Sequence, residues 1–272
     1  MNNAGAGKYN LIAGSGTDTL WGGSSDDIIT IAASGQGDAD TLDGYGGTDI
    51  LQLSAGTHTF TTNDNMIKNI EEVKVDTTSG STVDLTNQTE GFKITVGGQT
   101  DSITGSDGND IIIITSAGDG NNDTLIGGSG DDVINLSAGS HTFSDDAKLA
   151  TIETINANAS ATTLDLTGQL EGFTIAGGAQ GDNLTGGSGN DIITGGGGDD
   201  TLKGGAGNDT LNVDSGSDII TLLGGAGAGG EDDVLVVSNG ATATAANIIN
   251  FVATTGTTVS YTHLTLPTKR IV

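Results

Sequence analysis

The stretch GGAQGDNLTGGSGNDIITGGGGDDTLKGGAGNDTLN, residues 177–212, is one nine-residue phrase repeated four times. The copies follow the pattern GGxGxDxUx, in which U is a large aliphatic residue. Self-similarity at a fixed period is typical of repeat architectures, in which each unit buries its apolar face only against its neighbours. The stretch therefore predicts a stacked fold.

Looser copies of the phrase occur along the rest of the chain, for example at 13–30, 105–113 and 127–135. The residue two places after the sixth position is Leu or Ile in all fourteen copies that we recognise. The sixth position is an aspartate in each of them: Asp18, Asp27, Asp40, Asp49, Asp101, Asp110, Asp123, Asp132, Asp182, Asp191, Asp200, Asp209, Asp218 and Asp233.

Each part of the phrase has a physical role. Glycine permits positive φ, so the chain can turn sharply and aim its carbonyl groups inward. The last three residues predict a very short strand whose central aliphatic side chain points inward, because strand side chains alternate between two faces. Two phrases then complete one coil of a flattened solenoid. Asp182, Asp200 and Asp218 are expected along one edge, and Asp191 and Asp209 along the other.

The composition restricts the partners of the chain. The formal net charge is −27 and the pI is near 4.1, which makes nucleic acid and anionic membranes poor partners and cations good ones. There are 29 Asp and only 6 Glu, whereas a merely solvated acidic surface would use both freely. The chain has no Cys, and it has no apolar run of membrane-spanning length. Aspartate is therefore selected for its geometry, and its carboxylate is a ligand that Ca²⁺ prefers.

The repeated phrases resemble the calcium-binding nonapeptide repeats of RTX proteins over about half of the chain. The resemblance implies an all-β fold, a parallel β-roll or β-solenoid with calcium-binding GGxGxD turns and several Ca²⁺ ions. It also implies that the fourteen aspartates bind metal together with glycines of the turns: Gly186, Gly189, Gly195, Gly198, Gly204 and Gly207.

Only 3% of the residues are aromatic, so the apolar core of such a fold is small, and uncompensated carboxylates at the turns oppose folding. We therefore expect calcium binding to be linked to folding, with disordered repeats in the absence of calcium. A Gly/Asp-rich disordered linker is the alternative. The regular Leu or Ile two places after each sixth-position aspartate argues against a disordered linker.

A longer repeat is superimposed on the short one. LSAGTHTF at 53–60 returns as LSAGSHTF at 136–143, and DLTNQTEGF at 84–92 returns as DLTGQLEGF at 165–173. The interpretation is two modules, 1–95 and 96–176, and the start of a third at 177–258. Within them, the segments 53–95 and 136–176 are expected to continue the solenoid without metal, or else to form a small interposed β-domain. The segments 64–72 and 145–153 have weak helix signals.

Several other polar residues are weaker candidates for a functional site. His58 and His141 occupy equivalent places of the long repeat, and we expect a structural or surface role for both. Glu71, Glu72 and Glu153 fall in strand-like segments with no sign of a substrate cleft. Four aspartates directly precede a sixth-position aspartate and are expected either to add outer charge to a calcium site or to be solvated: Asp26, Asp131, Asp199 and Asp232.

The two remaining features concern Trp21 and the end of the chain. Trp21 is expected to be an exposed or end-capping aromatic residue. The last residues, VSYTHLTLPTKRIV at 259–272, contain the only Pro and no Asp or Gly. Their first part resembles one reading frame of a sequencing adapter. We therefore expect a non-native tail and a natural protein that continues further at both ends.

The predicted function is that of a calcium-binding, secreted or cell-surface β-roll region of a larger bacterial protein, of the surface-layer or adhesin type. The chain itself is expected to be non-enzymatic, because no catalytic motif occurs in it. The resemblance implies export by a type I secretion system, and cell-surface or extracellular matrix components are possible partners. Alternatively, the chain is the export and folding appendage of a secreted hydrolase or toxin whose catalytic domain lies upstream.

Overall fold

The computed structural model describes residues 7–35, 39–62, 64, 66–118, 121–157, 160–221 and 233–238, and the backbone of strands at 242–246, 250–253 and 258–263. The protein is built from short strands, and the pairings given by the described residues are parallel. Two compact units are present, Met1–Asn135 with Ala147–Ile152 and Leu136–Asp146 with Glu153–Val272. The all-β parallel solenoid predicted from the repeat is confirmed.

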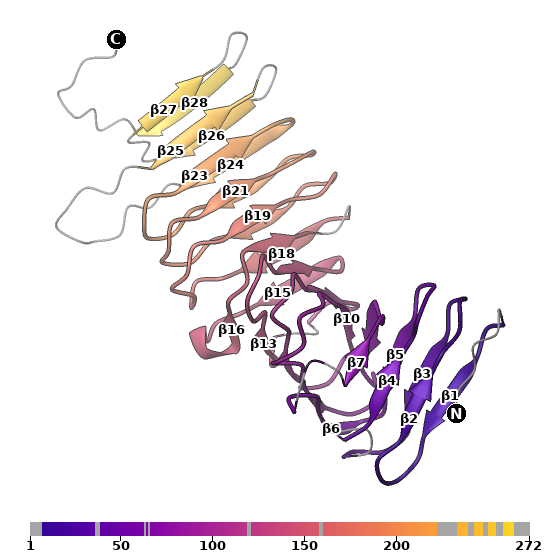
Figure 1. Ribbon diagram of the computed structural model, residues 1–272. Helices are drawn as coiled ribbons and strands as arrows, with labels where there is room; N and C mark the ends of the chain where they lie inside the picture. Colours follow the sequence, from indigo (N-terminus) through magenta and orange to yellow (C-terminus); the bar gives the residue numbers. More distant parts are fainter. Residues whose placement is uncertain are drawn as a thin grey trace. The chain divides into compact units, whose positions relative to one another are not determined.

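Unit 1 has three sheets (Figure 1). The first contains, in spatial order, β1 (Asn10–Ala13), β3 (Ile28–Ile31), β5 (Ile50–Leu53), β8 (Glu72–Lys74), β10 (Lys93–Val96), β12 (Ile111–Ile114) and β14 (Val133–Asn135). The second contains β2 (Thr19–Trp21), β4 (Thr41–Asp43) and β7 (Ile67–Lys68). The third contains β6 (Gly56–Thr59), β9 (Ser81–Asp84), β11 (Ser102–Thr104), β13 (Thr124–Ile126) and β16 (Leu149–Ala150).

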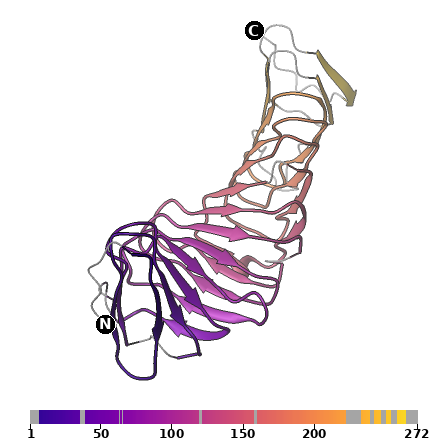
Figure 2. The same ribbon diagram turned by 90° about the vertical axis from the view of Figure 1, so that its right-hand side faces the viewer.

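Unit 2 has two rows of strands, and Figure 2 shows its coils stacked one on another. One row contains β17 (Thr154–Asn156), β19 (Thr174–Ala176), β21 (Ile192–Thr194), β23 (Thr210–Val213), β25 (Val234–Val237) and β27 (Asn250–Ala253). The other contains β15 (Gly139–Thr142), β18 (Thr162–Asp165), β20 (Asn183–Thr185), β22 (Thr201–Lys203), β24 (Ser217–Thr221), β26 (Thr242–Ala246) and β28 (Thr258–His263).

The nine-residue phrase forms half of one coil. In residues 174–203, strands alternate between the two rows, so that β20 pairs with β22 and β19 with β21. The register is in phase with the repeat, because Leu184 lies beside Leu202 and Ile193 beside Leu211. All fourteen aliphatic residues at the predicted inward position are buried: Leu20, Ile29, Leu42, Leu51, Ile103, Ile112, Leu125, Ile134, Leu184, Ile193, Leu202, Leu211, Ile220 and Leu235.

The segments between the repeat blocks also belong to the solenoid. In unit 1, β8 and β10 continue the first sheet between β5 and β12, in register with both. In unit 2, β18 pairs with β20 and β19 with β21, so the segment joins the repeat block directly. An interposed separate domain is therefore excluded for the described residues.

One irregularity marks each long repeat. In unit 1, β6 precedes β7 in the chain, yet β7 pairs backward with β4 while β6 pairs forward with β9. A buried glutamine fills the crossing, since Gln88 Nε2 donates to the Phe60 carbonyl at 2.6 Å and its Oε1 accepts the Ile67 N–H at 3.3 Å. In unit 2, Gln169 Nε2 donates to the Phe143 carbonyl at 2.8 Å.

One of the two weak helix signals is confirmed and the other is wrong. The segment 145–153 contains a 3-10 turn, η1 (Asp146–Lys148), followed by the strand β16. The described part of 64–72 contains the strand β7 and the start of β8 but no helix, so strand pairing outweighs the helix signal there. Among the described residues, no helix is long and apolar enough to cross a membrane.

The two histidines have a structural role and do not lie at the surface. His58 and His141 are fully buried, on the inward side of β6 and β15. His58 Nε2 lies 2.8 Å from the Ser54 carbonyl oxygen, and His141 Nε2 lies 3.0 Å from that of Ser137. Each ring therefore ties its strand to the turn that precedes it.

Candidate calcium-binding ladders

The sixth-position aspartates form ladders along the edges of the solenoid. In unit 2, the Asp182 N–H donates to Asp200 Oδ1 at 2.8 Å, and the Asp200 N–H donates to Asp218 Oδ1 at 2.8 Å. At the other edge, Asp191 donates to Asp209, and Asp209 donates to Asp233, each at 2.9 Å. The two edges thus carry the alternation that the two-phrase coil predicts.

Unit 1 carries ladders of the same kind. The Asp101 N–H donates to Asp123 Oδ1 at 2.8 Å, and the Asp110 N–H donates to Asp132 Oδ1 at 2.7 Å. The Asp18 N–H donates to Asp40 Oδ1 at 2.6 Å. Of the fourteen aspartates, all except the half-buried Asp18 are buried.

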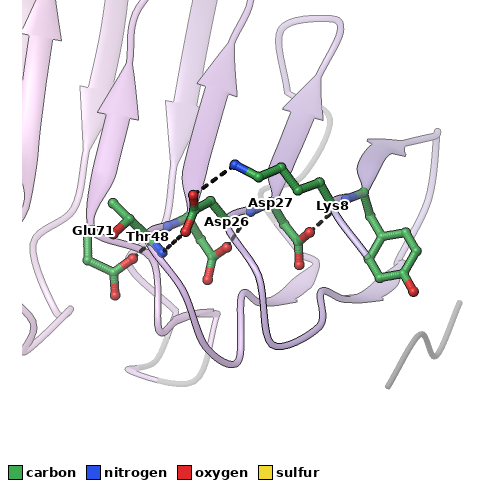
Figure 3. Close-up of polar contacts among 7 residues, drawn as sticks. Lys8, Asp26, Asp27, Thr48 and Glu71 are labelled. Atoms are coloured by element: carbon green, nitrogen blue, oxygen red, sulfur yellow. Dashed lines mark hydrogen bonds and ion pairs between the residues drawn. The ribbon is translucent and has the colours of Figure 1, made fainter. Parts of the chain in front are cut away.

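A glutamate takes part in one ladder, which the sequence pattern missed. Asp27 donates its N–H to Asp49 Oδ1 at 2.6 Å, and Asp49 donates to Glu71 Oε2 at 2.7 Å. Figure 3 shows the carboxylates of Asp27 and Glu71 directed to the same side. The signal in the sequence is the buried Val73 two places after Glu71, together with the 22-residue spacing from Asp49.

The turns fall into two classes according to whether Oδ2 of the ladder aspartate, the oxygen that faces its own turn, accepts a hydrogen bond. In the first class it accepts an N–H of its own turn, as in Gly187 N–H to Asp191 Oδ2 and Gly178 N–H to Asp182 Oδ2, at 2.8 and 2.7 Å. In the second class Oδ2 is buried and accepts no hydrogen bond: Asp49, Asp101, Asp200 and Asp218. Buried polar atoms without a partner are costly, so these four oxygens need a proton or a cation.

Backbone conformation explains two members of the second class. The residue four places before Asp200 is Gly196, with φ of 90°, and the residue four places before Asp49 is Tyr45, with φ of 69°. A left-handed residue at this place turns its N–H away from the carboxylate, and the Tyr45 N–H donates to Asp43 Oδ1 at 2.9 Å instead.

The first glycine of the phrase leaves space for the carboxylate. A Cβ atom at Gly195 would lie 2.4 Å from Asp200 Oδ2, and one at Gly44 would lie 2.3 Å from Asp49 Oδ2. Gly186 and Gly204 are in the same position relative to Asp191 and Asp209. Any side chain here would occupy the space beside the oxygen.

The fourth glycine has a different role, in packing. At Gly198 a Cβ would lie 2.4 Å from the Gly181 backbone nitrogen, and at Gly207 it would lie 2.3 Å from the Gly189 carbonyl oxygen. A Cβ at Gly189 would lie 2.2 Å from the Glu171 carbonyl carbon. These glycines let the backbones of neighbouring coils approach closely.

The buried carboxylates resist ionisation when no metal is present. Burial raises the pKa of four of them to about 6, against backbone N–H donors that lower it: Asp49, Asp101, Asp191 and Asp200. Burial also raises the pKa of Asp110 and Asp218. Neighbouring carboxylates act in the same direction, as Asp218 does on Asp200. A cation placed here would relieve both effects.

The aspartates that precede the ladder positions form hydrogen bonds between coils. Asp26 Oδ1 accepts the Thr48 N–H at 3.0 Å, and Asp199 Oδ1 accepts the Ser217 N–H at 2.8 Å. Asp26 also pairs with Lys8 at 2.8 Å (Figure 3). Asp131 donates its own N–H to Asn109 Oδ1 at 3.0 Å, and Asp232 lies outside the described residues.

The donor set fits calcium. No group of three or more His, Asp or Glu side chains that could hold a metal converges within the described part of the chain. A cation at a turn would therefore be held by at most two carboxylates together with backbone carbonyl oxygens, and Ca²⁺ accepts both ligand types. Zinc and other transition metals prefer His or Cys ligands, and the chain contains no Cys.

Comparison with known proteins agrees with this assignment. The family described as the RTX calcium-binding nonapeptide repeat matches residues 10–30, 33–57, 93–113 and 115–140, and four overlapping segments between 174 and 241. No curated protein matches the chain. The matched segments together cover more than half of the 272 residues and include every acidic ladder except the position of Glu71. The chain belongs to the family of RTX calcium-binding nonapeptide-repeat proteins.

Proposed function

We propose that the chain is the calcium-binding, secreted structural or adhesive β-roll region of a larger bacterial protein, and that it folds on binding several Ca²⁺ ions outside the cell. The proposed ligands are the fourteen ladder aspartates with carbonyl oxygens of their glycine turns, and Glu71 joins them. The observation that carries the proposal is the buried, unpartnered Oδ2 of Asp49, Asp101, Asp200 and Asp218.

Calcium concentration would then act as a switch between compartments. Extracellular calcium modules bind with dissociation constants of about 0.1 to 1 mM. In the calcium-poor cytosol a chain of net charge −27 would stay unfolded, which suits export through a type I secretion channel. Outside the cell, calcium would stabilise the folded state by mass action.

A structural or adhesive role of the surface-layer or adhesin type is supported by the long repeat. Two modules of similar length carry the same crossing, with Gln88 in one and Gln169 in the other. A solenoid extends by adding such modules and presents a long surface to cell-surface or matrix components. In this proposal the chain performs no catalysis.

The second candidate is an export and folding appendage of a secreted hydrolase or toxin. The two candidates make different predictions for the natural gene. The structural role predicts further copies of the module on either side of this chain, whereas the appendage predicts a catalytic motif upstream. Sequencing the flanking reading frame decides between them.

Limited trypsin digestion tests the calcium switch itself. Lys93 and Lys203 lie within strands β10 and β22, so both should be cut rapidly in excess chelator and resist cleavage in millimolar calcium. Magnesium at the same concentration is the control, because Mg²⁺ demands near-ideal octahedral geometry and dehydrates reluctantly. Equal cleavage with and without calcium would contradict the proposed switch.

A further inference from the structure

A small cluster on the second sheet of unit 1 combines exposed aromatic rings with fixed polar groups. The four described Phe side chains are buried, yet Tyr45 is 57% exposed. Its ring lies edge-to-face with that of Trp21, with the centroids 6.4 Å apart and the planes at 72°. The remainder of this surface is polar, so the pair is an isolated aromatic platform.

The backbone of Tyr45 is in a conformation that normally calls for glycine. Its φ is 69°, while the same place of other turns is occupied by Gly128, Gly196 and Gly205, with φ of 117°, 90° and 118°. A bulky L-residue is strained in the left-handed region. Strain retained at an exposed position is a sign of function, since glycine would remove it.

Polar groups around the ring are held in place. Asp43 Oδ1 accepts the Tyr45 N–H at 2.9 Å and the Asn69 side-chain N–H at 2.7 Å. No described residue donates to Asp43 Oδ2, and Lys68 forms no ion pair with a described residue. Trp21, Asp43 and Lys68 are also in register on adjacent strands, so all three point outward together.

We infer that this cluster, Trp21, Asp43, Tyr45, Lys68 and Asn69, binds the sugar rings of a neutral polysaccharide. A pyranose ring presents a face of C–H groups, which packs on the electron-rich face of Tyr45, while Trp21 supports the ring from its edge. Its hydroxyl groups donate to Asp43 Oδ2 and accept from Lys68 Nζ. A few fixed polar groups beside an apolar surface are the usual means of orienting a small ligand.

Charge and size favour a neutral sugar over other ligands. With a net charge of −27, the chain repels acidic glycans, and Asp43 does so locally. A stable protein partner would need a buried interface above about 1,000 Å² with an apolar centre. Two rings surrounded by polar residues provide a surface suited to one or two sugar units.

The site rests on the proposed function in one respect: Tyr45 belongs to the turn that precedes Asp49, so it is formed only in the calcium-supported fold. Trp21 is the single Trp of the chain, and its fluorescence therefore reports on this site alone. Far-UV circular dichroism of the same samples reports separately on folding. Failure of the sugar site and failure of the calcium switch thus give different results.

The experiment titrates the full chain, in millimolar calcium, with hexamers of glucose, mannose and galactose and with oligogalacturonate as the charged comparison. We expect a saturable change of Trp21 emission with at least one neutral hexamer. Tyr45→Gly should weaken binding about tenfold, the factor that corresponds to about 1.4 kcal/mol, without reducing the β signal. Tyr45→Phe should retain binding.

The control is Leu170→Ser, which removes a side chain of comparable exposure, 66%, from unit 2 and should leave binding unchanged. The inference is overturned if no neutral hexamer gives a saturable change in a chain whose β signal is intact, if only oligogalacturonate binds, or if Tyr45→Gly binds as tightly as the unaltered chain.

Discussion

Two glycines in one turn should respond very differently to the same substitution. Gly195 and Gly197 both precede Asp200, and neither has a positive φ. A Cβ at Gly195 would meet Asp200 Oδ2 at 2.4 Å and Asp200 Cγ at 3.1 Å. A Cβ at Gly197 would meet nothing closer than the Ala179 carbonyl oxygen at 3.3 Å. Only Gly195→Ala should therefore disturb the ladder.

The magnitudes follow from the contacts. Gly195→Ala must push the Asp200 carboxylate aside or shift the turn, and overpacking of this kind costs about 1 to 3 kcal/mol. Displacement also strains the 2.8 Å bond from the Asp182 N–H and moves the proposed calcium ligand. Gly197→Ala should change stability by less than about 1 kcal/mol, in the stabilising direction if anything, because alanine restricts the unfolded chain.

Urea denaturation in saturating calcium, followed by far-UV circular dichroism, measures both variants. Calcium titration of the same proteins should give a higher midpoint for Gly195→Ala and an unchanged midpoint for Gly197→Ala. Equal stabilities and equal midpoints for the two variants would refute the claim that the first glycine makes room for the carboxylate.

Two further predictions concern pH and the glutamate ladder. Without metal, four buried carboxylates have a folded-state pKa of about 6, above the unfolded value of about 3.9, so their ionisation opposes folding: Asp49, Asp101, Asp191 and Asp200. In chelator, the β signal should therefore grow as the pH falls from 7 to 4.5, and a signal that stays flat or falls while the protein remains soluble would contradict this. Glu71→Ala removes the acceptor of the Asp49 N–H and should destabilise unit 1 by about 1 to 2 kcal/mol, whereas Glu72→Ala loses ion pairs to the half-exposed Lys74 and Lys93 and a long, 3.4 Å hydrogen bond from the Thr95 hydroxyl and should cost less than about 1 kcal/mol. Urea denaturation compares the two variants, and a larger effect at Glu72 would contradict the ladder assignment.

The regular part of the fold was predictable because two periods coincide. Alternation along a strand and the nine-residue phrase both place Leu184, Ile193 and Leu202 inward, and all three are buried. The same arithmetic separates Asp191 from Asp200 onto opposite edges. Neither conclusion depends on details of the turns.

The turns themselves were harder to predict, because several sequences reach the same backbone shape. Asn69 and Thr151, with φ of 49° and 50°, stand where the phrase has its fourth glycine, and this hid the role of Glu71. The chain crossing at β6 and β7 depends on a buried glutamine whose importance the local pattern does not reveal. At Asp49 and Asp200, the unpartnered carboxylate oxygen depends on the φ of a single residue, Tyr45 and Gly196 respectively.

The proposed sugar site was also not predictable from the sequence. The sequence predicts an exposed or end-capping Trp21, whereas the structure packs it against Tyr45, which lies 24 residues away on the next coil. Only the register of β2 with β4 brings the two rings together.

We propose that cations at the acidic ladders hold this protein together, and a calcium titration of metal-free protein followed by far-UV circular dichroism tests this most directly. We expect a cooperative gain of β signal at about 0.1 to 1 mM calcium, and no such gain when magnesium is added instead. A full β spectrum in excess chelator at neutral pH would show that packing alone sustains the solenoid, and it would contradict the claim.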